Sequence, residues 1–488
     1  MKSETEANPS GNDATAARPR RRWLRWLGRL TAWGIGVLVV IIALSVKPVD
    51  RTPYFTTGYY DTTKDDFVTR SAAYKPVTGA LRAGFGKAKL SPVLGAAVDD
   101  PEHGQFKALP MAGYNERKSK PATDVHDELW VKAVAMEVEG KRLVMLSLDA
   151  LIVPPDVSKH VLAQLAAKYS LGQDEVYFSA THTHSGIGGW GKDRVSWAFA
   201  GDYQPGVAVW FEHQLVAAVD DAMSRMAPAS IGGGRFSEPK FVRNRLAKDR
   251  GRVDNEFSYL MLHHEDGSSA VIGVYNAHAT VLPNEVMELS ADYPGYWERQ
   301  VEKSTGGMAM YLAGAVGSHG PAYGYRSFEG AQEMGEGLAK EVLDRLPDTK
   351  LSPTTTLGAL GLDLALPESQ VRVLDTWRLR PTVTGALIPV ENHTHLQAVR
   401  LGDMLWFSTP CDFSGELAMD LKAPLELRGY HATITSFNGD YIGYVVPQHY
   451  YDYTKYESRA MSFYGPYVSP LMVDWMRRMA DVVAPVTK

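Results

Sequence analysis

The chain has 488 residues, a formal net charge of −5 at pH 7 and a hydrophobic content of 45%. This length and composition fit either two to three average domains or one large α/β domain, and they exclude a chain that is disordered throughout. The single cysteine, Cys411, excludes an internal disulfide and a cysteine-rich zinc site.

Charge is divided unevenly along the chain. Residues 1–47 carry eight basic and three acidic side chains, a net charge of +5, which leaves about −10 on the remaining residues. An acidic body is a poor match for the phosphate backbone of nucleic acids, so we expect no nucleic-acid partner.

The first predicted element is a membrane helix. Six arginines lie between Arg18 and Arg29, and residues 30–46 are then uncharged. A helix over these uncharged residues spans about 25 Å, and extension back to Trp23 makes it long enough to cross a bilayer. We therefore predict a basic tail over residues 1–22 and a transmembrane anchor over residues 23–46.

The arginines also predict the orientation of this anchor. They precede the apolar run, so the positive-inside rule keeps the N-terminus in the cytoplasm and places everything after Lys47 on the periplasmic or extracellular side. A cleaved signal peptide is the alternative. It is less favoured because SVKP at residues 45–48 lacks the small-x-small pattern of a cleavage site.

The rest of the chain predicts a connector over residues 47–79 and one folded body over residues 80–488. Two hairpins are predicted around the turns Glu139-Gly140-Lys141 and Glu265-Asp266-Gly267. The other expected elements are helices over residues 157–169, 207–226, 330–346 and 470–482, a short strand over 308–312 and a strand-rich stretch over 357–410. This order predicts an α/β fold, with mixed β-sheets covered by helices in one large domain.

Two histidines follow an apolar strand. Val176, Tyr177 and Phe178 are expected to end a buried strand, and His182 and His184 follow in the stretch THTHSGIGG. The strand period of two predicts that both imidazoles point to the same side, into a cleft beyond the strand end. Neutral imidazole is the commonest protein ligand of metals, so metal binding or catalysis is favoured over two surface histidines.

Several segments in order resemble the neutral/alkaline non-lysosomal ceramidase family. SATHTHSG at residues 179–186 is similar to the histidine signature of that family, and His278 falls where the family has a second strand-end histidine. MAGY at residues 111–114 resembles its early substrate loop, and Asn244-Arg245 resembles its Asn-Arg pair. The run from Tyr441 to Pro466 resembles its C-terminal tyrosine block. By this resemblance, residues 80–488 correspond to the family's catalytic domain.

The resemblance implies a zinc ion and a set of site residues. The implied metal ligands are His182, His278, Asp412 and Tyr444. The implied catalytic residues are His184, Arg245, Tyr456 and Ser318, and the implied substrate-binding residues are Gly113 and His319. From ligand type alone, imidazole with carboxylate suits zinc but also admits iron, copper or nickel.

The chain departs from the family pattern in three places. Asp412 stands where the family usually has Glu, so Glu416 is an alternative ligand. Gly320 stands where the family has a serine, which leaves Ser318 as a substitute nucleophile or a metal-activated water as the nucleophile. The chain also ends without the C-terminal immunoglobulin-like module of the family, and we expect the anchor to keep the body near the bilayer instead.

These observations predict a zinc-dependent amidohydrolase, anchored in a membrane, that cleaves the N-acyl amide of ceramide or a similar lipid. The alternatives are a zinc hydrolase of another N-acyl or ester substrate and a catalytically silent envelope binding module. The sequence leaves the oligomeric state and the preferred acyl length open.

Overall fold

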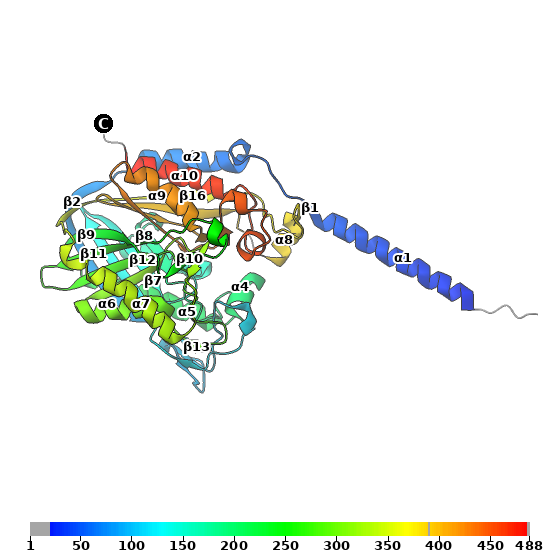
Figure 1. The fold of residues 1–488 in the computed structure, drawn as a ribbon, viewed down its shortest axis with the longest axis horizontal. Helices are drawn as coiled ribbons and strands as arrows, with labels where there is room; N and C mark the ends of the chain where they lie inside the picture. The colour runs from blue at the N-terminus through cyan, green and yellow to red at the C-terminus, as the bar shows by residue number, and fades with distance from the viewer. Residues whose placement is uncertain (1–19, 389–390, 486–488) are drawn as a thin grey trace, which may run out of the picture.

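The computed structural model describes residues 20–388 and 391–485 (Figure 1). Helix α1 (Arg20–Ser45) projects away from the body, and its stretch Trp23–Ser45 is long and apolar enough to cross a membrane. None of that stretch is buried against the body. A helix that is apolar all round and makes no contact with a core is typical of a membrane span or a signal sequence.

The body is built on a branched sheet of twelve strands in the described part of the chain. The strands are β2 (Val77–Lys89), β6 (Trp130–Val138), β7 (Lys141–Leu148), β8 (Val176–Ala180), β9 (Ala227–Ser237), β11 (Glu256–His264), β12 (Ser269–Tyr275), β14 (Met308–Ala313), β16 (Thr354–Ala365), β18 (His393–Leu401), β19 (Met404–Ser408) and β21 (His431–Thr435).

Strand β2 is the branch point of the sheet. Its first residues pair with β16, and its later residues pair with β6 and β9. Most neighbouring strands are antiparallel, but β7 with β8, β12 with β14 and β19 with β21 are parallel. The sheet is therefore mixed, as the sequence predicts.

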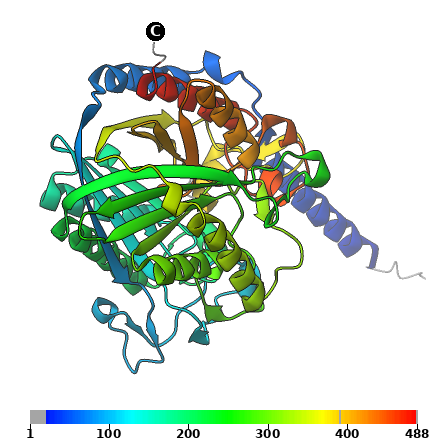
Figure 2. The same ribbon diagram turned by 60° about the vertical axis from the view of Figure 1, so that its left-hand side comes forward.

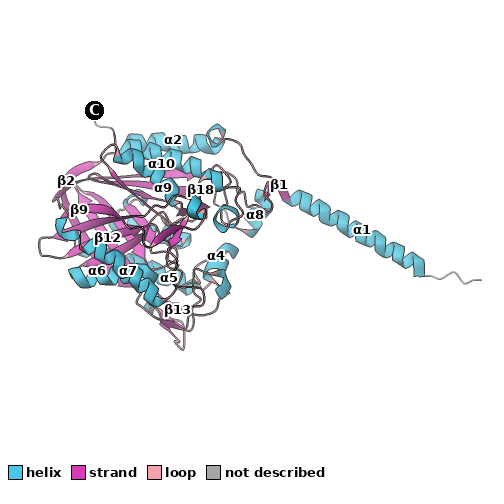
Figure 3. Ribbon diagram, viewed as in Figure 1, coloured by secondary structure: helices cyan, strands magenta, loops and turns pink. Residues whose placement is uncertain are grey.

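Helices cover the outer faces of the strands, and Figures 1 and 3 show them in groups on opposite sides. They are α2 (Gly58–Ala73), α3 (Pro155–Tyr169), α5 (Pro205–Ser224), α6 (Asp292–Thr305), α7 (Phe328–Leu343), α9 (Gly415–Glu426) and α10 (Val468–Val483). Two short helices, α4 (Arg194–Ala200) and α8 (Pro381–Leu387), lie outside these groups. α3 and α5 pack over β6 and β7, α6 and α7 over β12 and β14, and α9 and α10 over β16 and β18. The turned view in Figure 2 shows the strands curving inside this shell.

A further apolar core lies between strands alone. Its buried side chains include Leu81, Val134, Ile272, Met310 and Trp406, which come from both branches of the sheet. The two branches therefore pack face to face, and burying both faces of the strands explains their nearly continuous apolar sequences.

The expected helices and hairpins are present, with ends shifted by a few residues. The largest difference lies in residues 47–79, which we expected to form a connector. They contain α2, which packs on β16 and buries Thr63, and its Phe67 ring lies 5.5 Å from that of Trp475 in α10. The segment is therefore part of the body, because its scattered aromatic residues fill the space between α10 and the sheet.

Short two-stranded ladders hold the loops that carry the predicted site. β10 (Val242–Asn244) pairs with β15 (His319–Pro321), and β20 (Asp412–Phe413) pairs in parallel with β22 (Tyr444–Val445). The remaining ladders are β1 (Val46–Pro48) with β17 (Trp377–Leu379), β3 (Val93–Leu94) with β4 (Gln105–Phe106), and β5 (Asp124–Val125) with β13 (Glu288–Leu289).

Candidate metal centre

The predicted ligands lie just beyond the ends of separate strands. His182 follows the last residue of β8 by two positions, and His278 follows the last residue of β12 by three. Asp412 and Tyr444 face each other as register partners in the β20–β22 ladder. In α/β sheets, clefts beyond the strand ends are the usual ligand sites, and here they bring together residues from four distant segments.

Backbone carbonyls orient both strand-end histidines. His182 Nδ1 lies 2.6 Å from Leu151 O, and His278 Nδ1 lies 2.9 Å from Val316 O. A carbonyl only accepts hydrogen bonds, so each Nδ1 carries the proton and each Nε2 presents a lone pair. Burial, together with the nearby charge of Arg245, lowers the pKa of His278 to about 3, so its ring is neutral.

Asp412 is fully buried and lies between the two histidines. Its Oδ1 is 3.4 Å from His182 Nε2 and 3.1 Å from His278 Nε2, and its Oδ2 accepts a hydrogen bond of 2.9 Å from Tyr441 Oη. A hydrogen bond donated to a carboxylate favours its charged form, and Tyr441 supplies one at Oδ2. The carboxylate is therefore ionised.

These three atoms fit a bound cation. Two Nε2 lone pairs and one carboxylate oxygen face a common point, and Asp412 Oδ1 is a buried atom that no donor satisfies. Tetrahedral zinc with bonds of about 2.0–2.1 Å holds its ligand atoms about 3.3 Å apart. The observed separations of 3.1–3.4 Å from Oδ1 match this value, and three acceptors at such distances repel one another without a cation between them.

Two side chains compete for a fourth position. His184 Nε2 lies 3.3 Å from His182 Nε2, and the ligand atoms of His182, His184 and His278 all lie within 4.8 Å of one another. Tyr444 Oη lies 3.1 Å from His278 Nε2 and accepts a hydrogen bond of 2.9 Å from Arg245 Nη2. Burial and the neighbouring His182 hold the pKa of His184 well below its usual value, so this imidazole is also neutral.

An apolar cavity of about 290 Å³ leads to this centre. His182, His184 and Asp412 form part of its wall, with Tyr444 and Tyr456 beside them. The rest of the lining is largely apolar or aromatic and includes Leu151, Ile152, Pro154, Trp190, Phe199, Ile388, Phe463 and Tyr464. A concave apolar site with a few converging polar groups is the usual form of a small-molecule site.

A second, larger cavity of about 850 Å³ meets the first at the centre. The two share His184, Phe199, Tyr444 and Tyr456. The second cavity differs in character, because its lining includes Arg243, Arg245, Lys248, Arg326, Glu116 and Glu457. The centre therefore lies where an apolar space and a charged space join.

The sequence and the fold were compared with known proteins. Residues 93–319 match the family described as neutral/alkaline non-lysosomal ceramidase, N-terminal. Over these residues the chain is similar to this family. It is 27% identical over 259 residues to the neutral ceramidase of Pseudomonas aeruginosa, and 25% identical over 222 residues to that of Mycobacterium tuberculosis. These matches cover 49% and 42% of this chain but only 37% and 34% of those relatives, so about a third of each relative is matched.

Solved structures show the same fold over a longer stretch. The crystal structure of neutral ceramidase from Pseudomonas aeruginosa has a TM-score of 0.69 at 19% identity, covering 83% of this chain and 74% of that one. A ceramidase complexed with C2 has a TM-score of 0.68 at 18% identity, covering 84% of this chain and 76% of that one. The ceramidase fold therefore extends well beyond residues 93–319.

Most of the residues that the family resemblance implied come together. Arg245 bonds Tyr444, and its Nε lies 3.0 Å from Glu457 Oε1. The Tyr456 ring lies 5.6 Å from that of Tyr444, and its side chain lines both cavities. Gly113 has a φ of +112° and packs so tightly that a Cβ there would lie 2.5 Å from His184 Cα. Only glycine fits this contact.

Ser318 and His319 are not brought to the cavities. Both are fully buried, and neither lines either cavity. The Ser318 hydroxyl lies 2.7 Å from that of Ser414 and 2.9 Å from His319 Nδ1, while His319 Nε2 accepts a hydrogen bond from the Asp254 amide. The two side chains are therefore hydrogen-bonded to each other beneath the site.

Glu416, the alternative ligand to Asp412, is engaged elsewhere. Its Oε1 accepts a hydrogen bond of 2.8 Å from Asn244 Nδ2, and its Oε2 lies 3.4 Å from Tyr450 Oη. Gly320, at the position of the family's serine, lines the second cavity, and a Cβ there would lie 3.3 Å from Arg245 Cδ.

Sequence reasoning missed two residues that support the centre. Tyr441 donates to Asp412, and the Phe437 ring stacks on that of His182 at 4.1 Å between centroids. Tyr441 stood in the motif that carried the resemblance, but nothing in its spacing distinguished it from the other tyrosines of that block. Phe437 gave no signal, because a lone aromatic residue after a strand is usually part of the core.

Proposed function

We propose that this protein is a membrane-anchored zinc hydrolase that cleaves the N-acyl amide bond of a lipid, with ceramide as the leading candidate substrate. The observation that carries the proposal is the convergence of ligand atoms from His182, His278 and Asp412 beside an apolar cavity, where Asp412 Oδ1 is buried without a hydrogen-bond donor. The family match supports the reaction class, while the substrate has to be argued from the site itself.

His182, His278 and Asp412 would hold the ion, and His184 or Tyr444 would complete its ligands. When bound, zinc supplies Lewis-acid polarisation of an acyl carbonyl and lowers the pKa of a water molecule to about 7. The chain contributes the orientation of the ligands. The carbonyls of Leu151 and Val316 fix the tautomers, since rotation of either ring would break the bond at Nδ1.

Arg245 and the tyrosines face the reacting carbonyl. The Arg245 guanidinium donates to Tyr444 Oη at 2.9 Å, which holds both groups at the junction of the cavities. Burial raises the pKa of Tyr456, so its phenol stays protonated and can donate a hydrogen bond. Donors fixed in place before the reaction stabilise the oxyanion that develops as an amide is attacked, at no cost of reorganisation.

His184 is placed to move a proton when Tyr444, and not His184, completes the ligands of the ion. Its pKa lies well below the usual value, so it is neutral, and its Nε2 lies 3.3 Å from His182 Nε2 at the cavity wall. A neutral imidazole can accept a proton during attack and return it to the leaving amine. Ser318 is given no part in the reaction, because its hydroxyl is bonded to Ser414 and His319 away from both cavities.

We propose that α1 is an uncleaved anchor, with the N-terminus in the cytoplasm and the body on the periplasmic or extracellular side. Its apolar stretch is free of the body, and the strand after it is paired within the fold. Removal of a signal peptide would release the body from the membrane. Membrane fractions washed with alkaline carbonate test this directly, because only an integral protein stays with the pellet.

Metal content and hydrolysis together test the proposed function. Elemental analysis of the full chain in detergent should give about one zinc per chain, and His182→Ala and Asp412→Ala should each lose it. Release of fatty acid from ceramide should fall to background in both variants. A wild-type protein that holds zinc but cleaves neither amides nor esters would support the silent binding module, and one without metal would refute the mechanism.

A further inference from the structure

The second cavity carries cations that lack partners. Arg243, Lys248 and Arg326 line it, and no carboxylate of the described residues lies within 4.0 Å of their charged nitrogens. Of the two acidic residues in the lining, Glu457 is already paired with Arg245. The charge left over in this space is therefore positive, next to the centre where the reaction is proposed.

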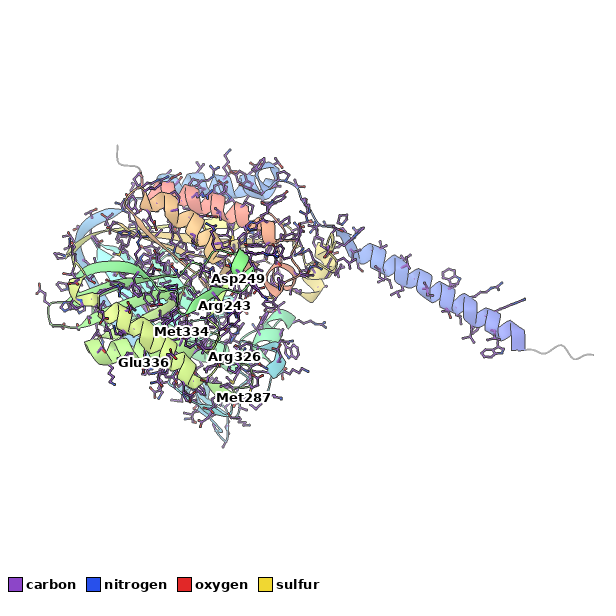
Figure 4. The ribbon with its side chains drawn as sticks, viewed as in Figure 1. Arg243, Asp249, Met287, Arg326, Met334 and Glu336 are labelled. Atoms are coloured by element: carbon purple, nitrogen blue, oxygen red, sulfur yellow. The ribbon has the colours of Figure 1, made fainter. Side chains whose placement is uncertain are left out.

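Two contacts hold the Arg243 side chain in an orientation suited to ligand binding. Its guanidinium carbon lies 4.0 Å over the ring of Tyr323, and its Nε donates to the carbonyl of Pro321 at 3.0 Å. These contacts orient the planar guanidinium and leave its terminal amino groups for a ligand. Arg243, in β10, and Arg326, in the loop before α7, are labelled in Figure 4, and both line this cavity. A fixed arginine fork suits the oxygens of a carboxylate, sulfonate or phosphate.

We propose that this cavity binds an anionic group on the amine half of the substrate, while the apolar cavity takes the acyl chain. The proposal rests on the proposed hydrolase function, and it favours N-acyl lipids whose polar half carries a carboxylate, sulfonate or phosphate over ceramide, whose polar half is uncharged. The junction of the two cavities places the amide bond beside His184, Tyr444 and Tyr456, which line both.

Two substrates with the same acyl chain and the same two-carbon link test the assignment. N-lauroyl taurine carries a sulfonate where N-lauroyl ethanolamine carries a hydroxyl, so the two differ only in the terminal group and its charge. We expect kcat/KM to favour the sulfonate by about tenfold, mostly through KM. Arg243→Gln combined with Arg326→Gln should reduce that preference to less than about threefold. Arg250→Gln, an exposed arginine of the same region outside the cavity lining, is the control.

Faster cleavage of the neutral substrate by the wild type would overturn the proposal while leaving the hydrolase intact. A preference for the sulfonate that survives in the double variant would assign it to groups outside this cavity, and would also overturn the proposal. Failure to cleave either substrate, or ceramide, with zinc bound would remove the proposed function and this inference together.

A separate observation concerns the anchor. Helix α1 ends at Ser45 and continues directly into β1, whose three residues pair with β17. The Ser45 carbonyl accepts a hydrogen bond of 2.9 Å from the Arg380 amide, and Lys47 Nζ lies 2.6 Å from Glu368 Oε2. The membrane-side end of the body is therefore fixed to the helix by a ladder and an ion pair.

The segment that holds the anchor also borders the apolar cavity. Before β17, the side chains of Val373 and Leu374 are 44% and 62% exposed, and Trp377 in β17 is 41% exposed. Helix α8 follows, and Figure 1 shows it beside β1 at the base of α1. Ile388, directly after α8, lines the apolar cavity. Exposed apolar and tryptophan side chains next to a spanning helix are typical of the membrane interface.

From this second observation we infer that residues 373–388 rest on the bilayer, so that the apolar cavity opens next to the lipid surface and substrate enters from the membrane. The inference rests on the proposal that α1 spans the bilayer. It is independent of the reaction, because it concerns only how the body sits on the lipid.

Single-cysteine labelling tests the orientation. Cys411 is fully buried, so a thiol-reactive fluorophore labels an introduced cysteine selectively. In the full chain reconstituted into phosphatidylcholine vesicles, a label at Leu374→Cys should be quenched several-fold more by spin-labelled lipid than one at Leu427→Cys. Leu427 is 91% exposed at the end of α9 and is the matched control. Leu38→Cys, within α1, reports insertion.

Equal and weak quenching at residues 374 and 427, with residue 38 strongly quenched, would overturn the inference and leave the anchor in place. Weak quenching at residue 38 would show that α1 is not inserted, and the inference would fall with the anchor. Neither outcome depends on hydrolysis, so each is separate from a failure of the proposed reaction.

Discussion

The Tyr441→Phe substitution is the sharpest test of the metal centre, because it changes one hydrogen bond and no ligand. Tyr441 Oη donates to Asp412 Oδ2 at 2.9 Å, and Asp412 is fully buried. Without the hydroxyl, the ionised carboxylate loses the side-chain hydrogen-bond donor that it has among the described residues. The ring itself remains to fill the same volume.

The magnitude follows from two independent generalisations. A hydrogen bond to a charged group contributes about 1.5–3 kcal/mol. Loss of an outer partner of a metal ligand typically lowers metal affinity about 10-fold to 100-fold, which corresponds to about 1.4–2.7 kcal/mol. We therefore expect zinc affinity to fall by a factor of about 10–100, with the circular dichroism of the fold unchanged.

The assay is competition for zinc between the protein and a chromogenic chelator, with hydrolysis measured at saturating zinc. Activity of Tyr441→Phe should largely recover when zinc is in excess, because its ligands are intact. Tyr464→Phe is the matched control, since Tyr464 is buried, lines the same cavity and donates to the Glu391 carbonyl instead of Asp412. Wild-type zinc affinity in Tyr441→Phe would refute the ligand role of Asp412.

Three further predictions concern neighbouring parts of the site and the stability of the body. Gly113→Ala should lower kcat/KM about 100-fold by displacing His184, and retention of the wild-type rate would contradict the contact at 2.5 Å. Ser318→Ala should lower the free energy of unfolding by about 1–2 kcal/mol and change kcat less than about threefold. A loss of kcat above 100-fold with zinc retained would indicate that Ser318 is a nucleophile. Burial raises the pKa of Asp292 to about 7, above its value of about 4 in the unfolded chain, so the folded state holds a proton that the unfolded state loses. The stability that this proton contributes is present below pH 4 and is lost, by roughly 4 kcal/mol, as the pH rises to 7. In urea unfolding, the free energy of unfolding of Asp292→Asn should depend less steeply on pH than that of the wild type. An unchanged pH dependence would refute this assignment.

The sequence was most informative where local patterns coincide with burial. The two hairpins and the long helices were found because alternating or helical apolar spacing continues for many residues. His182 and His278 could be located because each follows such a strand. Local pattern could not show that α2 packs on the sheet, since its single fully buried side chain, Thr63, leaves no apolar stripe.

His182 and His184 lie close together for a different reason from the one that the sequence predicted. Alternation along a strand predicted that His182 and His184 share a side, but β8 ends at Ala180 and both lie in the following loop. His182 adopts a φ of +59°, a left-handed conformation that a strand pattern does not contain. The ring is held there by the Leu151 carbonyl and by Phe437, which are distant in sequence and therefore invisible to spacing.

The balance of charges around the centre explains how an arginine can lie so close to the proposed cation site. Arg245 is balanced by Glu457, whose carboxylate lies 3.0 Å from its Nε, so the pair adds no net charge. His184 and His278 are neutral, and burial keeps the phenols of Tyr441 and Tyr444 protonated by raising their pKa values. With a divalent ion bound, Asp412 alone would offset its charge, which would leave one positive charge in a buried site. In the proposed reaction that remaining charge would favour an oxyanion over a neutral amide, so the balance that tolerates Arg245 would also favour the transition state of acyl cleavage over its substrate.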